Sequence, residues 1–261
     1  MQALLAQLMG ASELMETSLD ATLFFVIFLI ATFAASLVAG LAGFAFGLVA
    51  AAMWLYILTP LETATLIIWY GLIVQGYAVW KLRHAIHWGR ITPLVIGAAL
   101  GVPLGAYGLA TANPRALRLG IGMTLVLYSV YALMRPAMKQ VTGGGAVADA
   151  AVGVLNGALG GATGFAGIIA TIWCQLRGWP KDQQRAVFQP VGVATFAMSA
   201  AWISGQGSMS RNVLWLFALG LPALLLGTWA GMKLYGRLDE NQFRTVVLVL
   251  LLASGAVLLI R

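Results

Sequence analysis

The chain has 261 residues, of which 61% are hydrophobic and only 9% are charged, and its mean hydropathy is +0.91. Because a soluble domain carries about a quarter charged residues, this composition excludes an ordinary water-soluble globule and indicates a protein embedded in the lipid bilayer. The formal net charge of +7 comes from basic residues scattered over short loops, so we expect no nucleic-acid partner.

Ten apolar segments follow one another along the chain, each close to a length that crosses or enters a bilayer. They cover residues 21–39, 44–58, 63–80, 91–111, 116–134, 146–158, 163–176, 186–204, 212–235 and 243–260. We therefore divide the chain into an N-terminal segment outside the cytoplasm, 1–20, a first transmembrane repeat, 21–139, and a second transmembrane repeat, 140–261.

Two glycine-rich stretches interrupt this apolar sequence, GLAGFAFG at 40–47 and GALGGATG at 157–164. Irregular backbone cannot face lipid, because an unsatisfied peptide group in hydrocarbon costs several kcal/mol, so these breaks must be buried or line a cavity. Paired breaks at corresponding places in two halves of a chain point to the binding site of a transporter.

The two halves also align as sequence, which predicts an internal repeat. Gly40, Gly43 and Gly47 align with Gly157, Gly160 and Gly164. Further on, Leu104-Gly105 aligns with Leu226-Gly227. An odd number of segments in each half makes the second half enter from the opposite side of the membrane, so the repeats are predicted to be inverted.

Basic residues orient the chain, because cytoplasmic loops are enriched in Lys and Arg. With the N-terminus outside, the cytoplasmic loops hold Lys81, Arg83, Arg90, Arg135, Lys139, Arg177, Lys181, Arg185, Lys233, Arg237 and Arg244. Only Arg115, Arg118, Arg211 and Arg261 lie on the other side. We expect a multi-pass protein of the bacterial inner membrane with both termini outside the cytoplasm.

The expected fold class is thus an all-α polytopic membrane protein of two inverted repeats, each a glycine-broken helical hairpin followed by three transmembrane helices. Residues 146–158 would span only about 20 Å at 1.5 Å per residue, less than the ~30 Å hydrocarbon core. We therefore expect re-entrant hairpins, one from each side, whose tips meet near the midplane. The alternative of fully crossing arms stays open.

The chemistry expected at the tips is that of a helix N-terminus, whose first N–H groups lack intrahelical partners and attract anions. Thr163 suits the N-cap of a helix over 163–176, whereas Phe46 stands at the equivalent place and suggests an aromatic wall. Polar side chains inside apolar segments complete the candidate site, since burying them in lipid is costly. The candidate substrate-binding residues are Gly43, Phe46, Gly47, Gln75, Asn156, Gly160, Gly161, Thr163, Gly164 and Gln189.

Gln189 precedes Pro190, which frees a helix carbonyl, so it is equally well explained as structural. The single Cys174, and His84 with His87, do not form a metal-ligand set. We find no serine–histidine–acid set and no phosphate-binding loop, so we expect neither enzyme activity nor a cofactor. The carboxylates lie near segment ends, so a facilitator is a simpler expectation than a proton-driven carrier.

The glycine patterns, each followed by three apolar segments with LGAYG at 104–108 or LGTWA at 226–230, resemble the sulfite exporter TauE/SafE family. The resemblance covers roughly residues 20 to 260. It implies a bacterial transporter of two related halves and a small sulfur-containing anion, such as sulfite or an organosulfonate, as substrate. Phe44, Ala45 and Phe46 depart from the glycine-richer first turn of that family, which leaves the identity of the anion open.

Two other classes remain compatible with the sequence. One is a non-transporting membrane scaffold or partner subunit, and the other is an ion channel lined by freed carbonyl groups. The sequence leaves open the direction of transport, any coupling ion and the oligomeric state, a homodimer included.

Overall fold

The computed structural model describes residues 2–111, 114–134, 140–163, 166–204 and 210–260, with the side chains of 2–21 and of some other helix residues outside that description. Within these ranges the chain forms ten α-helices and one short 3₁₀-helix. They are α1 (Gln2–Ala42), α2 (Phe46–Trp54), α3 (Pro60–Lys81), η1 (Arg83–Ala85), α4 (Trp88–Thr111), α5 (Pro114–Met134), α6 (Gly145–Thr163), α7 (Ile168–Leu176), α8 (Lys181–Ser204), α9 (Arg211–Tyr235) and α10 (Glu240–Ile260).

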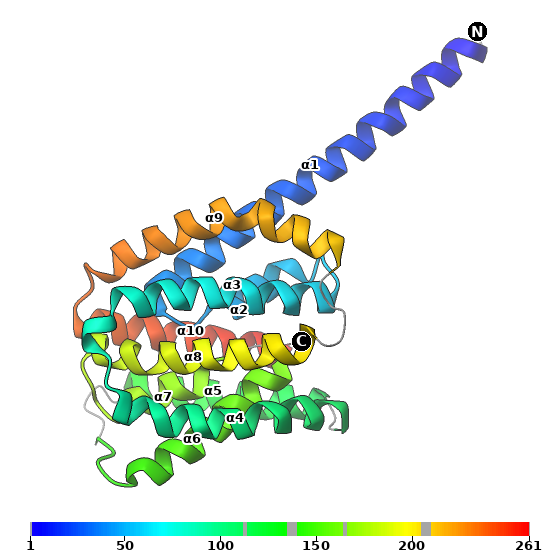
Figure 1. The fold of residues 1–261 in the computed structure, drawn as a ribbon. Coiled ribbons are helices and arrows are strands. Elements are labelled where there is room, and N and C mark those ends of the chain that lie inside the picture. The colour runs from blue at the N-terminus through cyan, green and yellow to red at the C-terminus, as the bar shows by residue number, and fades with distance from the viewer. Residues whose placement is uncertain (1, 112–113, 135–139, 164–165, 205–209, 261) are drawn as a thin grey trace.

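The all-helical class expected from the sequence is confirmed, and so are its ten main segments. α1 begins much earlier than expected and is continuous from Gln2, so its N-terminal part extends beyond the bundle (Figure 1). α6 continues to Thr163 and is about 28 Å long at 1.5 Å per residue. The expectation of a short arm over 146–158 was therefore wrong, and the short arms are the nine-residue helices α2 and α7.

Three helical stretches among the described residues are long and apolar enough to cross a membrane by length and composition alone, namely 22–42, 61–81 and 211–235. Local signals explain where two of these helices begin. Thr59 and Glu62 form a capping box at the start of α3, with Pro60 in the first turn. Ser210 caps α9 by accepting a hydrogen bond from the Val213 N–H.

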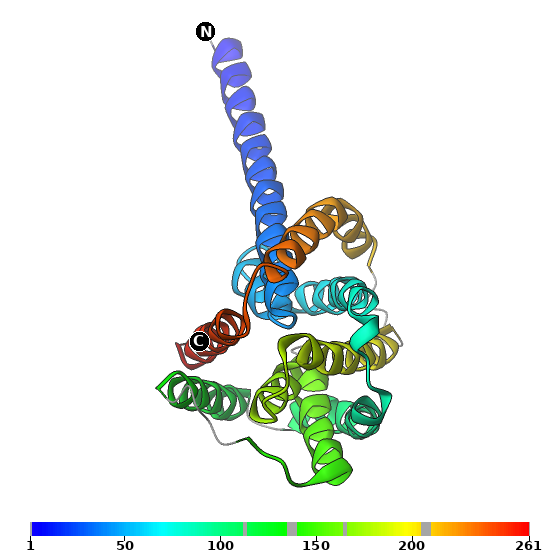
Figure 2. The same ribbon diagram turned by 90° about the vertical axis from the view of Figure 1, so that its left-hand side faces the viewer.

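The helices pack as four main pairs, α1 with α9, α4 with α6, α3 with α8, and α5 with α10. Figure 2 places the α3–α8 pair between the α1–α9 and α4–α6 pairs, with α5 and α10 at one side. This pairing maps onto itself when the first five α-helices are exchanged with the last five. The halves are thus interleaved, because each contributes one helix to every pair.

Glycines let the helix backbones of these pairs come very close, as small residues do in membrane helix interfaces. A Cβ atom built on Gly101 of α4 would lie 2.1 Å from the Val154 carbonyl oxygen of α6. A Cβ atom on Gly227 of α9 would lie 2.5 Å from the Phe33 carbonyl oxygen of α1. Gly101 and Gly227 therefore hold similar places in the two pairs.

The same kind of contact recurs along both pairs at intervals of one helical turn. Gly97, Gly101 and Gly105 of α4 each face a carbonyl oxygen of α6, as Gly227 and Gly231 of α9 face those of α1. Likewise Gly157 and Gly161 of α6 face carbonyl oxygens of α4, as Gly40 of α1 faces that of Thr228. Glycines recur every four residues on these helices, so alignments one turn apart look alike in the sequence.

The α1–α2 and α6–α7 hairpins open toward opposite ends of the bundle (Figure 1). α7 returns to the end where α6 begins, since the Val141 N–H donates to the Leu176 carbonyl oxygen at 2.9 Å. α2 runs back along α1, since the Trp54 and Phe28 rings stack with centroids 5.4 Å apart. The loop after α2 lies at the end where α3 and α9 begin, and the starts of these two helices are joined by a 2.7 Å hydrogen bond from the Asn212 side-chain amide to the Glu62 carboxylate.

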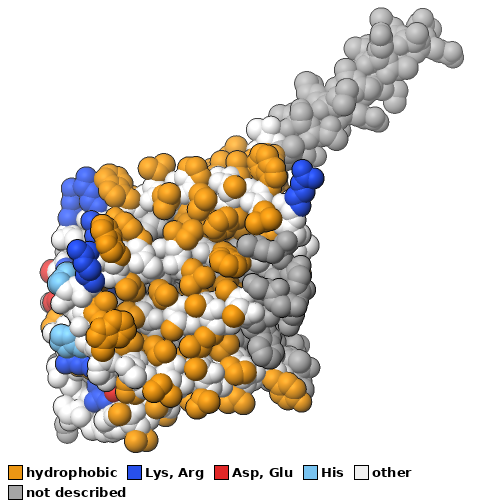
Figure 3. Space-filling model, in the orientation of Figure 1, with side chains coloured by type: hydrophobic (Ala, Val, Ile, Leu, Met, Phe, Trp, Pro, Cys, Tyr) orange, Lys and Arg blue, Asp and Glu red, His pale blue; other side chains and the backbone are white. Residues whose placement is uncertain are grey.

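Charged side chains are concentrated at one end of the bundle, where Figure 3 shows Lys, Arg and His side chains beside a largely apolar surface. Arg211, at the start of α9, lies at the opposite end. Arg185 corrects the expectation that it belongs to a loop, because it lies inside α8 and is completely buried. We refer to the end that carries Arg83, Arg177 and Lys181 as the basic end.

Candidate functional site

The second break lies between α6 and α7. α6 ends at Thr163, and α7 begins at Ile168 with Gly167 as its N-cap at φ 96°. The expectation that Thr163 caps this helix was wrong, because the chain needs a left-handed residue directly before α7 and glycine adopts that conformation without strain. The side chain of Thr163 and the whole of Gly164 lie outside the described residues, so their place in the site stays a prediction.

Asn156 of α6 caps α7 across the break. Its Oδ1 accepts hydrogen bonds from the Gly167 N–H at 3.1 Å and the Ala170 N–H at 3.3 Å, and the side chain is completely buried. Two backbone N–H groups at the N-terminus of α7 are therefore already hydrogen-bonded. Fewer N–H groups are left for an anion at this place than the sequence predicted. The Nδ2 of Asn156 has no hydrogen-bond partner among the described residues.

The first break lies between α1 and α2. Gly43 has φ 93°, its N–H donates to the Ala39 carbonyl oxygen at 2.6 Å, and Phe44 and Ala45 lead into α2. Gly47 is buried in the first turn of α2. Both breaks thus turn on a left-handed glycine followed by a helix of nine residues.

The turns of the two breaks meet inside the bundle. A Cβ atom built on Gly167 would lie 3.8 Å from the Cβ atom of Phe44, an ordinary contact. Ala166 of the second break packs into the apolar cluster built mainly from α1, α2, α3 and α9. Phe44 and Ala45 of the first break pack into the other cluster, around α7, α8 and α10. The contact of the two tips is thus as the sequence predicted.

α8 forms a wall along both breaks. A Cβ atom on Gly43 would lie 2.8 Å from the Phe188 ring and 3.0 Å from the Gln189 Nε2. One on Gly160, in the last turn of α6, would lie 2.5 Å from the Thr195 methyl group. Gln189 donates to the Gly43 carbonyl oxygen at the long distance of 3.5 Å, and its Oε1 has no partner among the described residues. α8 therefore brings Gly43, Gly160 and Gln189 together along one helix.

Gln75 of α3 reaches the same wall. It is 4% exposed, and a Cβ atom on Gly192 of α8 would lie only 1.8 Å from its Oε1. Gly192 follows Gln189 by three residues, so the two glutamines lie about one turn apart along α8. The Oε1 atoms of both have no hydrogen-bond partner among the described residues. Buried polar atoms usually have partners, so these amides are unusual for a purely structural core.

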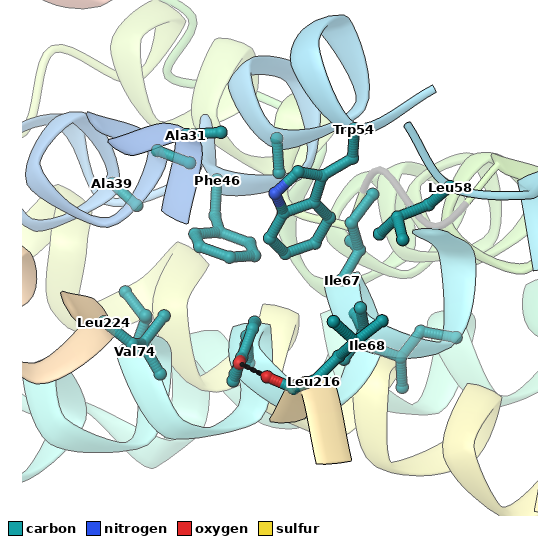
Figure 4. Close-up of a cluster of buried hydrophobic side chains, with 14 of the residues drawn as sticks. Ala31, Ala39, Phe46, Trp54, Leu58, Ile67, Ile68, Val74, Leu216 and Leu224 are labelled. Carbon is teal, nitrogen blue, oxygen red and sulfur yellow. Dashed lines mark hydrogen bonds between the residues drawn. The ribbon is translucent and has the colours of Figure 1, made fainter. Parts of the chain in front are cut away.

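Phe46 belongs to the apolar cluster that also contains Ala166 of the second break. Its ring lies in an aromatic cluster, edge-on to Trp54 and Tyr70 with centroids 5.9 and 6.0 Å away (Figure 4). Two further aromatic side chains lie where the turns meet, Phe44 and Phe188, whose rings meet edge-on at 6.4 Å. Phe44 stands out in the sequence as part of a bulky first turn, whereas Phe188 and Gly167 were not among the predicted site residues, although a third glycine following Gly164 was a visible signal.

Gly161 faces away from the break toward α4. A Cβ atom there would lie 2.3 Å from the Val102 carbonyl oxygen, and one on Gly157 would lie 2.4 Å from that of Ala98. Helix packing explains both glycines, as it explains small residues in membrane helix interfaces generally. A role of Gly161 in binding substrate is unsupported by its position.

A cavity of about 440 Å³ lies at the basic end, between α5, α10 and the α7–α8 connection. Its lining includes Tyr128, Gln175, Gln184 and Arg244. Tyr128 donates to the Gln175 Oε1 at 3.1 Å, and the Gln184 Nε2 donates to the Trp179 carbonyl oxygen at 2.7 Å. By contrast, the amides at the two breaks are buried, so the structure is closed around them.

An all-helical bundle with apolar spans and two buried, touching backbone breaks defines a polytopic membrane protein. A family model described as Sulfite exporter TauE/SafE matches residues 27–258. The chain belongs to the sulfite exporter TauE/SafE family, a family of membrane transporters. No curated protein and no solved structure matches the chain.

Proposed function

We propose that this protein is a secondary carrier or facilitator for a small sulfur-containing anion, such as sulfite or an organosulfonate. The anion would bind where the Gly43 and Gly167 turns meet. The observation that carries the proposal is this meeting of two breaks beside buried amides whose hydrogen-bonding capacity is incompletely used. Asn156 keeps a donor atom without a described partner, which an anion oxygen would accept from.

The family membership supports an anion as substrate, and the chemistry of the breaks is consistent with it. The N-terminal end of α7 is the positive end of its helix dipole. Two backbone N–H groups there, of Gly167 and Ala170, already donate to a neutral acceptor, the Asn156 Oδ1. An anion can reach this place only if the turns separate, because the side-chain amides of Asn156 and Gln189 and the two turns are buried. A carrier requires a motion that exposes the turns of the two breaks first to one end of the bundle and then to the other.

A thermal-shift measurement on the purified protein tests the substrate class. Sulfite, thiosulfate, a sulfonate and a carboxylate are added separately, with chloride at equal ionic strength as control. A ligand that binds only the folded state stabilises it by RT ln(1 + [L]/Kd), which is about 2.7 kcal/mol at 100 times Kd. We expect a saturable rise in melting temperature with a sulfur oxyanion. No rise with any of the anions would favour a scaffold or partner subunit.

We further propose that the two halves are inverted repeats and that the basic end is cytoplasmic, with both termini outside. The opposite openings of the two hairpins and the exchange of helix partners support the inversion. The gathering of basic side chains at one end supports the orientation, in a bacterial inner membrane.

Cysteine labelling tests this orientation, since the native Cys174 is completely buried and should give little background. We expect a membrane-impermeant maleimide added to intact cells to label Tyr56→Cys, in the loop after α2. It should label His84→Cys, at the basic end, only after the membrane is permeabilised. The opposite pattern would place the termini in the cytoplasm.

A cation channel lined by freed carbonyl groups is the second candidate. Reversal potentials in salt gradients separate it from an anion carrier, because preference for Na⁺ or K⁺ over anions would contradict the proposed substrate class. We propose no enzymatic reaction and no cofactor.

A further inference from the structure

Arg185 is a completely buried cation on α8, one turn from the start of the helix. Its Nη1 donates to the carbonyl oxygens of Gly40 at 2.9 Å and Leu41 at 3.2 Å, and its Nη2 lies 3.3 Å from the sulfur of Met232. The guanidinium lies 4.2 Å from the centre of the Tyr235 ring. It thus contacts the last turn of α1 and the end of α9.

No carboxylate lies within ion-pair distance of Arg185 in the part of the chain that the structure describes, where the recorded pair is Arg177–Asp149. Asp182, one turn earlier on α8, accepts a hydrogen bond from the Tyr235 hydroxyl. The positive charge is therefore balanced by the negative end of the α1 dipole, by the face of the Tyr235 ring and, without a direct ion pair, by the nearby Asp182 carboxylate. Buried charges normally have a direct ionic partner, so a cation held this way suits an anionic ligand.

Arg185 also lies directly beside the first break. Gly40 and Leu41 are in the last turn of α1, three and two residues before the left-handed Gly43. One turn further along α8, Phe188 and Gln189 pack against Gly43 itself. The guanidinium and the Gln189 amide are therefore neighbours along one helix, next to the same turn.

We infer that Arg185 is the positive charge that binds the transported anion, and that the anion takes the place of the α1 carbonyl groups as acceptor of the guanidinium N–H groups. This inference rests on the proposed function. In the closed structure Arg185 holds the end of α1 and so fixes the Gly43 turn. When an oxyanion binds, the guanidinium gives up its hydrogen bonds to the Gly40 and Leu41 carbonyl oxygens, and the first break becomes free to move. Recognition of the anion and release of the turn are one event.

Transport in proteoliposomes, with sulfite and a two-carbon sulfonate as probes, tests this inference through Arg185→Gln and Arg185→Lys. Gln keeps a donor for the α1 carbonyl groups but removes the charge, so we expect its KM to rise by about tenfold or more. Lys keeps the charge but loses the planar fork, so we expect a smaller rise of about threefold. Arg177→Gln, which removes a cation at the same end, is the matched control and should leave KM unchanged.

The outcomes separate a binding role from a structural one. A lower melting temperature for Arg185→Gln with KM unchanged would make Arg185 a helix cap only and overturn the inference. If Arg185→Gln does not fold, the Lys variant decides, because an unchanged KM for both probes would also overturn it. Failure of the wild type to transport or bind any anion would instead overturn the proposed function.

Discussion

Replacing Gly101 with Val should prevent α4 and α6 from packing and leave little correctly folded protein. The added Cβ would lie 2.1 Å from the Val154 carbonyl oxygen and 2.8 Å from the Ala158 backbone nitrogen. Both are backbone atoms, which cannot rotate away as a side chain can. Overpacking typically costs about 1–3 kcal/mol, and we expect the upper end or more here because the whole helix must move.

The control for this experiment is Gly76→Val on α3, where a Cβ atom would meet nothing within 4 Å. Both variants change glycine to the same residue inside a helix, so their difference reports packing rather than helix propensity. Thermal unfolding and elution as a single species in detergent provide the measurement. Equal stability of the two variants would show that α4 and α6 do not approach each other as described.

Replacing Asn156 should have the next largest effect, and two variants separate its structural role from its proposed binding role. Asn156→Leu leaves the Gly167 and Ala170 N–H groups buried without an acceptor, which costs about 1–3 kcal/mol for each unsatisfied donor. Asn156→Asp keeps an acceptor for both N–H groups at the positive end of α7. We therefore expect Leu to destabilise the protein strongly and Asp to preserve its melting temperature.

Transport distinguishes the two variants further. A carboxylate at this position would repel an anion at the meeting point of the turns, so we expect Asn156→Asp to transport sulfite at least about tenfold more slowly than wild type, a loss of ~1.4 kcal/mol in transition-state stabilisation. Uptake into proteoliposomes, corrected for the amount of folded protein, is the measurement. Wild-type transport by Asn156→Asp would remove this residue from the anion path.

Much of the architecture could be predicted from the sequence, because it follows from the lipid environment and from the lengths and spacing of the apolar segments. Apolar length predicted the helices, and the first glycine-rich stretch contains the first break, but residues 157–163 of the second stretch belong to α6 and the turn of its break, at Gly167, follows that stretch. The sequence could not show which glycine carries the left-handed turn. Gly164 and Gly167 are both compatible with it, and the choice of Gly167 depends on Asn156, which reaches the turn from the middle of α6.

The candidate site was harder to predict than the fold, because its contacts join residues far apart in the chain. Phe188 was hidden in an apolar run, and only the packing of α8 against Gly43 gives it a place at the first break. From the sequence, Arg185 was predicted to be one more cytoplasmic loop residue. Its place just before an apolar segment does not show whether its side chain is buried. Gly161 appeared to belong to the break, but its packing against Val102 became visible only once α4 was placed.

The interleaved pairing of α1 with α9 and of α4 with α6 also bears on how the protein is made. Synthesis proceeds from the N-terminus, so α1 enters the membrane long before its partner exists. Until α9 emerges, the close-packing faces around Ser36 and Gly40 must be covered by lipid or by the insertion machinery. The first half therefore emerges with the partners of α1, α3, α4 and α5 still missing, and the final packing is reached only when the last helices are made.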